Sequence, residues 1–216
     1  SAGSGKRFAS KTPKQYIKVN GKEILLHSIE KFSGIKNISS LTIATGKDSM
    51  NIIKKILFNL EINIPVFVVE GGETRAKSVK NAFDSLNWSK DDFVIIHDAA
   101  RPFISVKKIR NLMATALKYG SALPCMKIND TIKLGKNGQV IKTISRKNLY
   151  TVQTPQIFKC NILKQSYNKI SDKKFDFTDE SSIVENAGYT VHIAEGEDSN
   201  IKITTKKDLV YFEIYN

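Results

Sequence analysis

The chain has 216 residues, a length that predicts one domain, and 41% of them are hydrophobic, which excludes a disordered chain. Cys125 and Cys160 lie far apart in the sequence, so we expect both to be reduced thiols. Its apolar runs are too short to cross a bilayer as helices and it begins with no apolar signal region, so we expect a soluble intracellular protein, cytoplasmic or in a plastid-type organelle. The net charge of +13 indicates an anionic partner, but charge alone does not choose among nucleic acid, membrane surfaces and phosphorylated small molecules.

Strand-like and helix-like segments alternate along the first half of the chain. Strands are predicted at residues 41–44, 65–69 and 93–96, and each is followed by a predicted helix, at residues 50–57, 74–86 and 104–117. The predicted strands are continuously apolar, as expected for strands buried on both faces. This pattern predicts an α/β fold, with a mainly parallel sheet and helices on both of its faces.

Residues 128–152 interrupt this alternation. Two short strand-like stretches flank a turn that contains Asn137-Gly138, and an Asn-Gly step favours a β-hairpin. A hairpin inserted in an α/β domain has little core of its own. We expect this β-arm either to pack on another chain or to cover the active site.

The first seven residues form a glycine-rich, basic loop. Glycines allow backbone N–H groups to surround an anion, and Lys6, Arg7 and the nearby Lys14 add positive charge. A Walker A loop is excluded because Arg7 follows Lys6, and a dinucleotide fingerprint is excluded because position 8 is Phe. The loop is therefore either an ordinary basic turn or a site for phosphate groups.

Two carboxylates are candidate functional groups. Asp98 follows the apolar stretch 93–96, at the edge of an open sheet where ligands bind, and it could hold Mg²⁺ or cap a helix. Asp198 lies four residues before Lys202 and forms a second candidate group. Thr205 to Asp208 has the form of a helix-capping box, so we interpret Thr205 as structural.

Taken in order, several segments resemble the 2-C-methyl-D-erythritol 4-phosphate cytidylyltransferase family over essentially the whole chain. The residues that carry the resemblance are Ala2-Gly3-Ser4-Gly5-Lys6-Arg7, Pro13-Lys14-Gln15-Tyr16, Gly71-Gly72 with Arg75 and Ser78-Val79, residues 97–102, Asp130-Thr131-Ile132-Lys133, Gln153-Thr154-Pro155-Gln156, Thr178-Asp179 and residues 200–204. No single motif is decisive, but the ordered set is specific.

The resemblance implies a Rossmann-like nucleotidyltransferase domain over residues 1–216, with a β-arm at about 128–152 that joins two subunits in a homodimer. It implies CTP as a substrate, Mg²⁺ as a cofactor, and transfer of a cytidylyl group to 2-C-methyl-D-erythritol 4-phosphate with release of pyrophosphate. The implied catalytic residues are Arg7, Lys14 and Lys202, and the implied metal ligands are Asp98 and Asp198. The implied nucleotide-binding residues are Ala2, Gly3, Gly5, Lys6, Gly72, Glu73, Arg75, Ser78 and Asp98. The implied acceptor-binding residues are Arg101, Thr131, Arg146, Thr154 and Thr178, some of them from the partner subunit.

Three features depart from the family pattern, one of them Ser1, which stands where Ala is usual. Family members have a strand before the phosphate loop, so we expect a first N-terminal strand to be missing ahead of Ser1. Ser145 precedes Arg146 where Asp is usual, which removes a charge beside a proposed acceptor ligand.

Other functions stay open at this point. A related enzyme acting on ribitol or ribulose 5-phosphate is the nearest alternative, and a catalytically dead scaffold is another. A basic nucleic-acid-binding module should show stacking aromatics among clustered cations, whereas Phe67, Phe83 and Phe93 fall at core-like positions. We therefore expect neither a nucleic-acid nor a membrane partner.

Overall fold

The structure is a computed structural model, which describes residues 13–58, 60–170 and 177–215. The side chain of Lys14 is not among the described groups. All seven residues of the predicted phosphate loop lie outside the described residues, including Ala2, Gly3, Gly5, Lys6 and Arg7.

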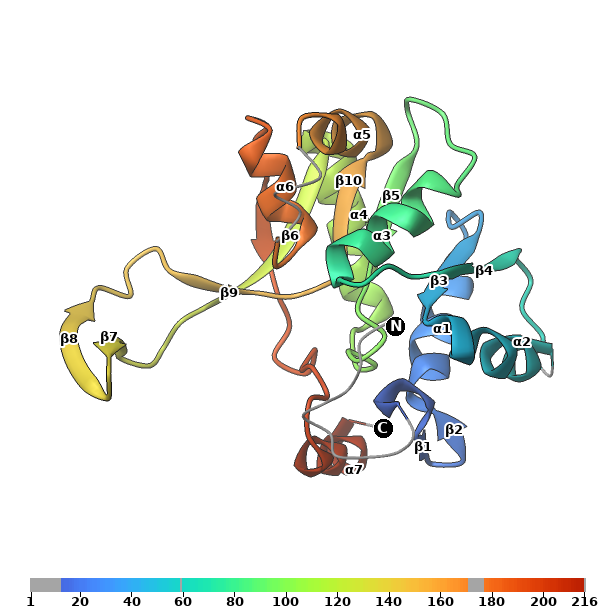
Figure 1. Cartoon of the computed structure of the whole chain (residues 1–216), viewed down its shortest axis with the longest axis horizontal. Helices are drawn as coiled ribbons and strands as arrows, with labels where there is room; N and C mark the ends of the chain where they lie inside the picture. The colour runs from blue at the N-terminus through green and yellow to red at the C-terminus, as the bar shows by residue number, and fades with distance from the viewer. Residues whose placement is uncertain (1–12, 59, 171–176, 216) are drawn as a thin grey trace.

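The helices and strands follow one another as Figure 1 labels them. The N-terminal part contains η2 (Lys14–Tyr16), β1 (Lys18–Val19), β2 (Lys22–Glu23), α1 (Ile24–Ser33), β3 (Leu41–Thr45), η3 (Lys47–Ser49), α2 (Met50–Phe58), β4 (Val66–Glu70) and α3 (Arg75–Asp84). The middle contains β5 (Phe93–Ile96), α4 (Val106–Tyr119), β6 (Ser121–Lys127), β7 (Ile132–Lys136), β8 (Gln139–Ile144) and β9 (Tyr150–Val152). The C-terminal part contains β10 (Gln156–Lys159), α5 (Cys160–Asn168), α6 (Glu180–Asn186), β11 (Ile193–Glu195), η5 (Lys206–Val210) and α7 (Tyr211–Tyr215).

The predicted α/β alternation is confirmed, and local capping explains where the helices begin. Thr74 caps α3 by accepting a hydrogen bond from the backbone N–H of Lys77. Ser105 caps α4 in the same way, so this helix begins two residues later than predicted. The predicted capping box at Thr205 is present and begins η5.

The sheet is mixed, in contrast to the mainly parallel sheet expected. β3 pairs in parallel with β4, and β11 pairs in parallel with β6. β10 lies between β5 and β6 and runs antiparallel to both. The reason is the connection: the chain leaves β6 through a hairpin rather than a crossover helix, so it returns in the opposite direction.

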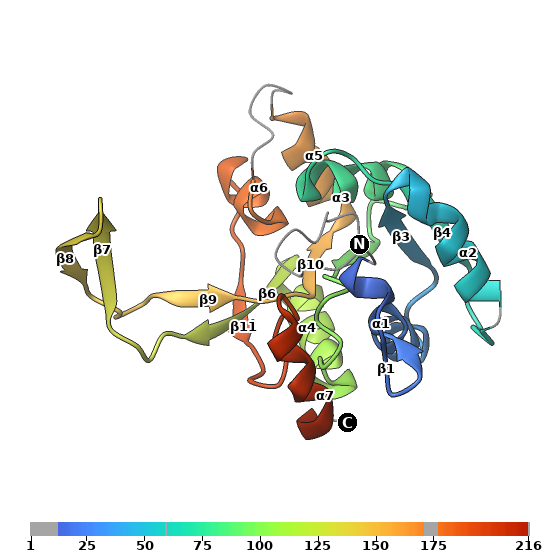
Figure 2. The same cartoon turned by 60° about the horizontal axis from the view of Figure 1, so that its bottom comes forward.

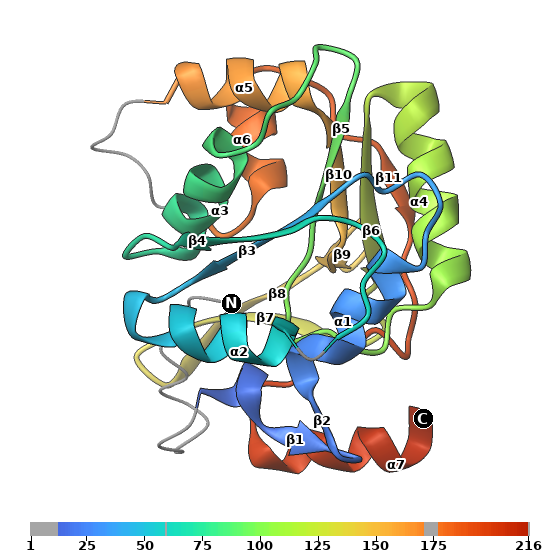
Figure 3. The ribbon, with the colours of Figure 1, turned by 90° about the vertical axis from the view of Figure 1, so that its right-hand side faces the viewer.

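Helices cover both faces of the sheet, as Figure 3 shows. Successive residues of β10 point to opposite faces. Phe158 packs in a core cluster with residues of α3, α5 and α6, whereas Ile157 packs with Leu112 and Ala116 of α4. The two buried cysteines are free thiols, and burial raises the pKa of each to about 11.

A cavity of about 1040 Å³ lies between β3 and β5, and residues of both strands line it. One edge of β5 faces this cavity. The side chains of β5 are therefore less buried than its apolar sequence predicts. Phe67 was expected at a core-like position but is 54% exposed, since β4 pairs only with β3 among the described strands. The expected strand ahead of Ser1 stays a prediction.

The hairpin predicted around Asn137-Gly138 is present as β7 and β8, and it projects from the body of the molecule in Figures 1 and 2. Both turn residues have positive φ angles, 51° for Asn137 and 78° for Gly138, as a tight two-residue turn requires. Apolar side chains on the hairpin are exposed, including Val140 at 65% and Ile141 at 56%. None of the helices described is both long and apolar enough to span a membrane.

Candidate active site

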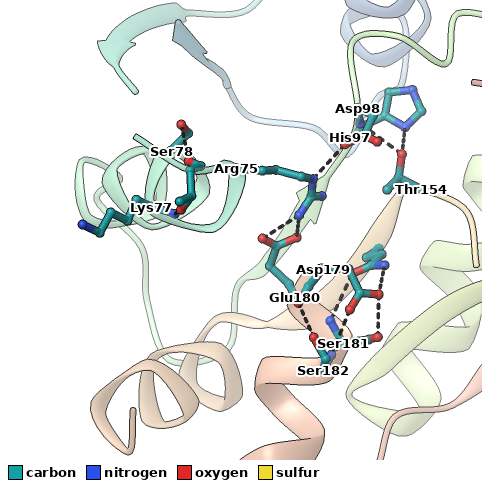
Figure 4. A network of polar contacts seen from close by, with 12 residues as sticks. Arg75, Lys77, Ser78, His97, Asp98, Thr154, Asp179, Glu180, Ser181 and Ser182 are labelled. Carbon is teal, nitrogen blue, oxygen red and sulfur yellow. Dashed lines mark hydrogen bonds and ion pairs between the residues drawn. The ribbon is translucent and has the colours of Figure 1, made fainter. Parts of the chain in front are cut away.

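Asp98 is the centre of a charged cluster at the carboxyl end of β5. Its Oδ1 accepts a hydrogen bond of 3.0 Å from Nε of Arg75, at the start of α3 (Figure 4). Its Oδ2 lies 2.6 Å from Nζ of Lys202. Three segments that are far apart in the sequence thus meet at one carboxylate, and they include three of the residues that the sequence singled out.

The charges of this cluster determine the protonation state of Asp98. Burial alone would raise the pKa of the Asp98 carboxyl, but Arg75 and Lys202 outweigh it and hold that pKa well below its ordinary value. The carboxylate is therefore ionised at neutral pH. A fixed negative charge between two cations organises both of them for an anionic ligand.

Glu180 is a member of the site that the sequence reasoning missed. It is fully buried at the start of α6, and its two carboxylate oxygens accept hydrogen bonds of 2.9 and 2.7 Å from Nη1 of Arg75. Burial raises the pKa of the Glu180 carboxyl, and the positive charge of Arg75 opposes that rise. The signal available in the sequence was its place directly after Thr178-Asp179, which carries part of the family resemblance.

A neutral histidine, His97, is linked to Asp98 through the hydroxyl of Thr154. The backbone N–H of Asp98 donates to Oγ1 of Thr154 at 3.0 Å, and this hydroxyl lies 3.2 Å from Nδ1 of His97. Nε2 of His97 lies 2.9 Å from the backbone oxygen of Arg101, so the tautomer protonated at Nε2 satisfies every contact. Burial lowers the pKa of His97 to about 4. Thr154, expected to reach the acceptor, is buried and uses its hydroxyl within the chain.

The loop between β4 and α3 is held in shape by Ser78. Its Oγ accepts from the backbone N–H of Gly72 at 3.0 Å and donates to the backbone oxygen of Thr74 at 2.8 Å. At position 72 there is no room for a larger residue than glycine, because an added Cβ would lie 2.5 Å from Cβ of Lys77. Glu73 points outward and pairs with Lys77 at 3.3 Å.

The large cavity connects this loop with the charged cluster. Its polar end is lined by Glu73, Arg75, Ser78, Asp98 and Lys202, and its apolar part lies between β3 and β5. The structure therefore brings together the nucleotide-binding candidates that lie within the described residues. A concave space with a few charged groups at one end is typical of small-molecule sites.

The remaining candidates lie apart from Asp98 or at the edge of the cluster. Arg101 donates from Nη1 to the backbone oxygen of Asn200 at 2.7 Å, and its buried Nε makes no hydrogen bond to any residue described. Arg146 is exposed at the base of the hairpin and lines a second cavity of about 330 Å³ with Lys127 and Lys147. Three further candidates are exposed: Thr131, Thr178 and Asp198.

A resident metal centre is not formed by the described side chains alone. Within residues 13–58, 60–170 and 177–215, no three His, Cys, Asp or Glu side chains could hold an ion together. Mg²⁺ commonly binds through one or two carboxylates together with substrate phosphates. The ionised Asp98 suits that kind of shared site, because each of its oxygens can accept more than one contact.

Comparison with known proteins gives one consistent result. A family model described as 2-C-methyl-D-erythritol 4-phosphate cytidylyltransferase matches residues 1–216. The chain is 39% identical to the protein of that name from Thermosipho africanus, over 96% of this chain and 91% of the relative. The crystal structure of that enzyme from Francisella tularensis has a TM-score of 0.84 and 31% identity, covering 100% of this chain and 96% of the neighbour. The 4-diphosphocytidyl-2C-methyl-D-erythritol synthase structure from Anaerococcus prevotii has a TM-score of 0.83 and 30% identity, covering 97% and 92%.

Proposed function

Because this chain belongs to the 2-C-methyl-D-erythritol 4-phosphate cytidylyltransferase family, we propose that the Asp98 cluster is where it carries out that reaction. The reaction transfers the cytidylyl group of CTP to 2-C-methyl-D-erythritol 4-phosphate and releases pyrophosphate, in the non-mevalonate route to isoprenoid precursors. The observation that supports this location is the convergence of Arg75, Asp98 and Lys202 at the polar end of the large cavity.

The chemistry accounts for a site made mainly of fixed charges. A phosphate oxygen of the acceptor attacks the α-phosphorus of CTP in line, and pyrophosphate leaves. The attacking oxygen is already anionic, so the reaction needs no general base. The obstacles are repulsion between two anions and the charge that grows on the leaving group. Positively charged side chains held in place lower both barriers.

We assign the cations by their place relative to Asp98. Lys202 is held at Asp98 by its 2.6 Å contact and remains 41% exposed, so it can also face the phosphates of CTP. Arg7 and the side chain of Lys14 lie outside the described groups, and we propose from the family resemblance alone that they complete the phosphate site. Gly72 and Ser78 shape the loop that would receive the nucleoside.

The acceptor site is proposed to be completed by a second copy of the chain. Arg146, Lys127 and Lys147 line one basic cavity at the base of the hairpin, separate from the cavity that holds Asp98. An arginine beside two lysines suits a phosphate group, which a planar guanidinium can grip at two oxygens. In a homodimer with exchanged hairpins, this cavity and Thr131 would face the Asp98 cluster of the partner.

Mg²⁺ is proposed to bind where the phosphates of CTP meet Asp98, with Asp198 as a second carboxylate ligand. When bound, it would neutralise charge on the phosphoryl oxygens. The residues of the chain would orient the nucleotide around that position. A cytoplasmic location remains a prediction.

The deciding experiment is pyrophosphate release from CTP and Mg²⁺, with 2-C-methyl-D-erythritol 4-phosphate or ribitol 5-phosphate supplied in parallel. Release with the first acceptor alone is expected. Release with ribitol 5-phosphate alone would keep the proposed site but overturn the acceptor assignment. The absence of release with either acceptor, from a chain shown to be folded, would overturn the placement of the reaction in this chain.

A further inference from the structure

Glu180 is a buried acid whose only hydrogen-bonding partner among the described side chains is Arg75. Its side chain has no exposed surface, and both of its oxygens receive N–H bonds from the same guanidinium nitrogen. Burying a carboxylate costs free energy unless it is paired, and an apolar side chain at position 180 could fill the same space without that cost. This raises the question of what the charge does beyond filling the core.

The position of Glu180 is fixed by a second, independent network. Asp179 caps α6 by accepting from the backbone N–H of Ser182 at 3.1 Å, and it also accepts from Nε2 of Gln156 at 2.8 Å. Oε1 of Gln156 accepts in turn from the backbone N–H of Ser181 at 3.1 Å. Figure 4 shows that these contacts tie the start of α6 to β10, so the carboxylate of Glu180 is presented from a rigid base.

Arg75 transmits this position to Asp98. Nη1 is held by Glu180 and Nε donates to Asp98, so two anchors set the plane of the guanidinium. Its Nη2 makes no hydrogen bond to any residue that the structure describes, and the side chain is 30% exposed beside the cavity. A guanidinium has five donors in a fixed fork, so fixing two of its nitrogens also fixes where the third one points.

We infer that Glu180 is a positioning residue for the nucleotide, acting through Arg75. This inference rests on the proposed function and deepens it. Both oxygens of Glu180 hold Nη1 of Arg75, while Nε of the same guanidinium donates to Asp98, so Glu180 sets the orientation of Arg75 at the cluster. It also directs Nη2 of Arg75 toward the polar end of the cavity, where an oxygen of CTP can accept from it.

A purely structural ion pair would behave differently from a positioning residue. A structural pair would lower thermal stability when broken, and the folded protein would keep its affinity for CTP. A positioning residue would weaken CTP binding through Arg75 and leave the affinity for the acceptor unchanged. These two outcomes are separated by comparing the two substrates and by a double-mutant cycle.

The test uses Glu180→Gln, Arg75→Met and the double variant, with Glu185→Gln as a matched control on the exposed side of α6. For each protein, the KM for each substrate and kcat are measured by pyrophosphate release, and CTP binding is measured by calorimetry without acceptor. We expect Glu180→Gln to weaken CTP binding by roughly 10- to 100-fold, with the KM for the acceptor changed less than threefold. In the Arg75→Met background, the same substitution should have no further effect on CTP.

Two results would overturn the inference. One is unchanged CTP affinity in a folded Glu180→Gln protein, and the other is a full additional loss in the Arg75→Met background. If Glu180→Gln does not fold, Glu180→Asp decides, because it keeps the charge but withdraws the carboxylate from Nη1. Wild-type CTP affinity in that variant would also contradict the inference. A wild-type protein that binds CTP without turnover would contradict the proposed function and leave the binding cycle interpretable.

Discussion

The Asp98 cluster and the β7–β8 hairpin differ in what a single chain can complete. Around Asp98, one chain supplies both cations and the buried acid that holds one of them. On the hairpin, Leu134, Val140 and Ile141 are 45%, 65% and 56% exposed, and an isolated two-stranded hairpin is marginally stable. The difference teaches that the proposed nucleotide end can be held together by contacts within one chain, whereas the hairpin leaves apolar side chains exposed that a second chain would cover in the proposed dimer.

The largest expected effect on activity is at the Asp98 cluster. Lys202→Ala removes a cation held 2.6 Å from Asp98 beside the proposed phosphates. We expect kcat/KM to fall roughly 100- to 1000-fold, as for other electrostatic contacts made in a transition state. Pyrophosphate release measures this, with Lys207→Ala as an exposed control. Activity within threefold of wild type would remove Lys202 from the mechanism.

The next effect tests the acceptor site that is proposed at the base of the hairpin. Arg146→Ala should raise the KM for the acceptor roughly 10- to 100-fold, because the proposed charged contact to the acceptor phosphate would be lost. Its KM for CTP should stay near the wild-type value, since Arg146 lines a different cavity from Asp98.

Mixing the two variants sharpens the comparison further. If hairpins are exchanged, a mixed dimer of the Lys202→Ala and Arg146→Ala chains holds one intact site, so refolding them together should restore about a quarter of wild-type activity. Each variant refolded alone is the control. No recovery, from a mixture shown by light scattering to be dimeric, would place the acceptor site within one chain.

The sequence predicted the parts of the fold that depend on local patterns. The helix at α3 follows from apolar residues at helical spacing, and the hairpin turn follows from Asn137-Gly138, since both patterns involve residues a few positions apart. The direction of β10 did not follow, because it depends on the path of the chain through the hairpin.

The candidate site divides in the same way. Asp98 and Lys202 carried a signal, since a carboxylate at the end of an apolar strand and a lysine in an ordered motif point to phosphate chemistry. Glu180 carried almost none, because its role depends on a contact with Arg75 across 105 residues. Thr154 was predicted to reach the acceptor, and only the fold places its hydroxyl beneath Asp98.

A fourth prediction concerns the pH dependence of stability near Asp98. The pKa of His97 is about 4 in the folded protein and near its ordinary 6.5 when unfolded, so the unfolded chain binds a proton first as the pH falls. The free energy of unfolding should therefore fall between pH 6.5 and 4, by roughly 3 kcal/mol at most. Urea unfolding without Mg²⁺ measures this, and the interval from pH 7 to 8 is the internal control. His97→Gln should flatten the dependence, and an equally steep curve for that variant would assign the loss to other groups.

The smallest expected effect compares one glycine from each region. In Gly72→Ala, the new Cβ would lie 2.5 Å from Cβ of Lys77, so the loop before α3 has to shift and lose its hydrogen bond to Ser78. We expect a loss of about 1–3 kcal/mol in stability and a higher KM for CTP. In Gly135→Ala on the hairpin, the nearest described atom would be the backbone oxygen of Gln139 at 3.3 Å, a contact that a small shift relieves. That variant should stay within about 0.5 kcal/mol of wild type. Equal effects of the two substitutions would mean that the loop at Gly72 is no more tightly determined than the hairpin, which would weaken its assignment to the nucleotide.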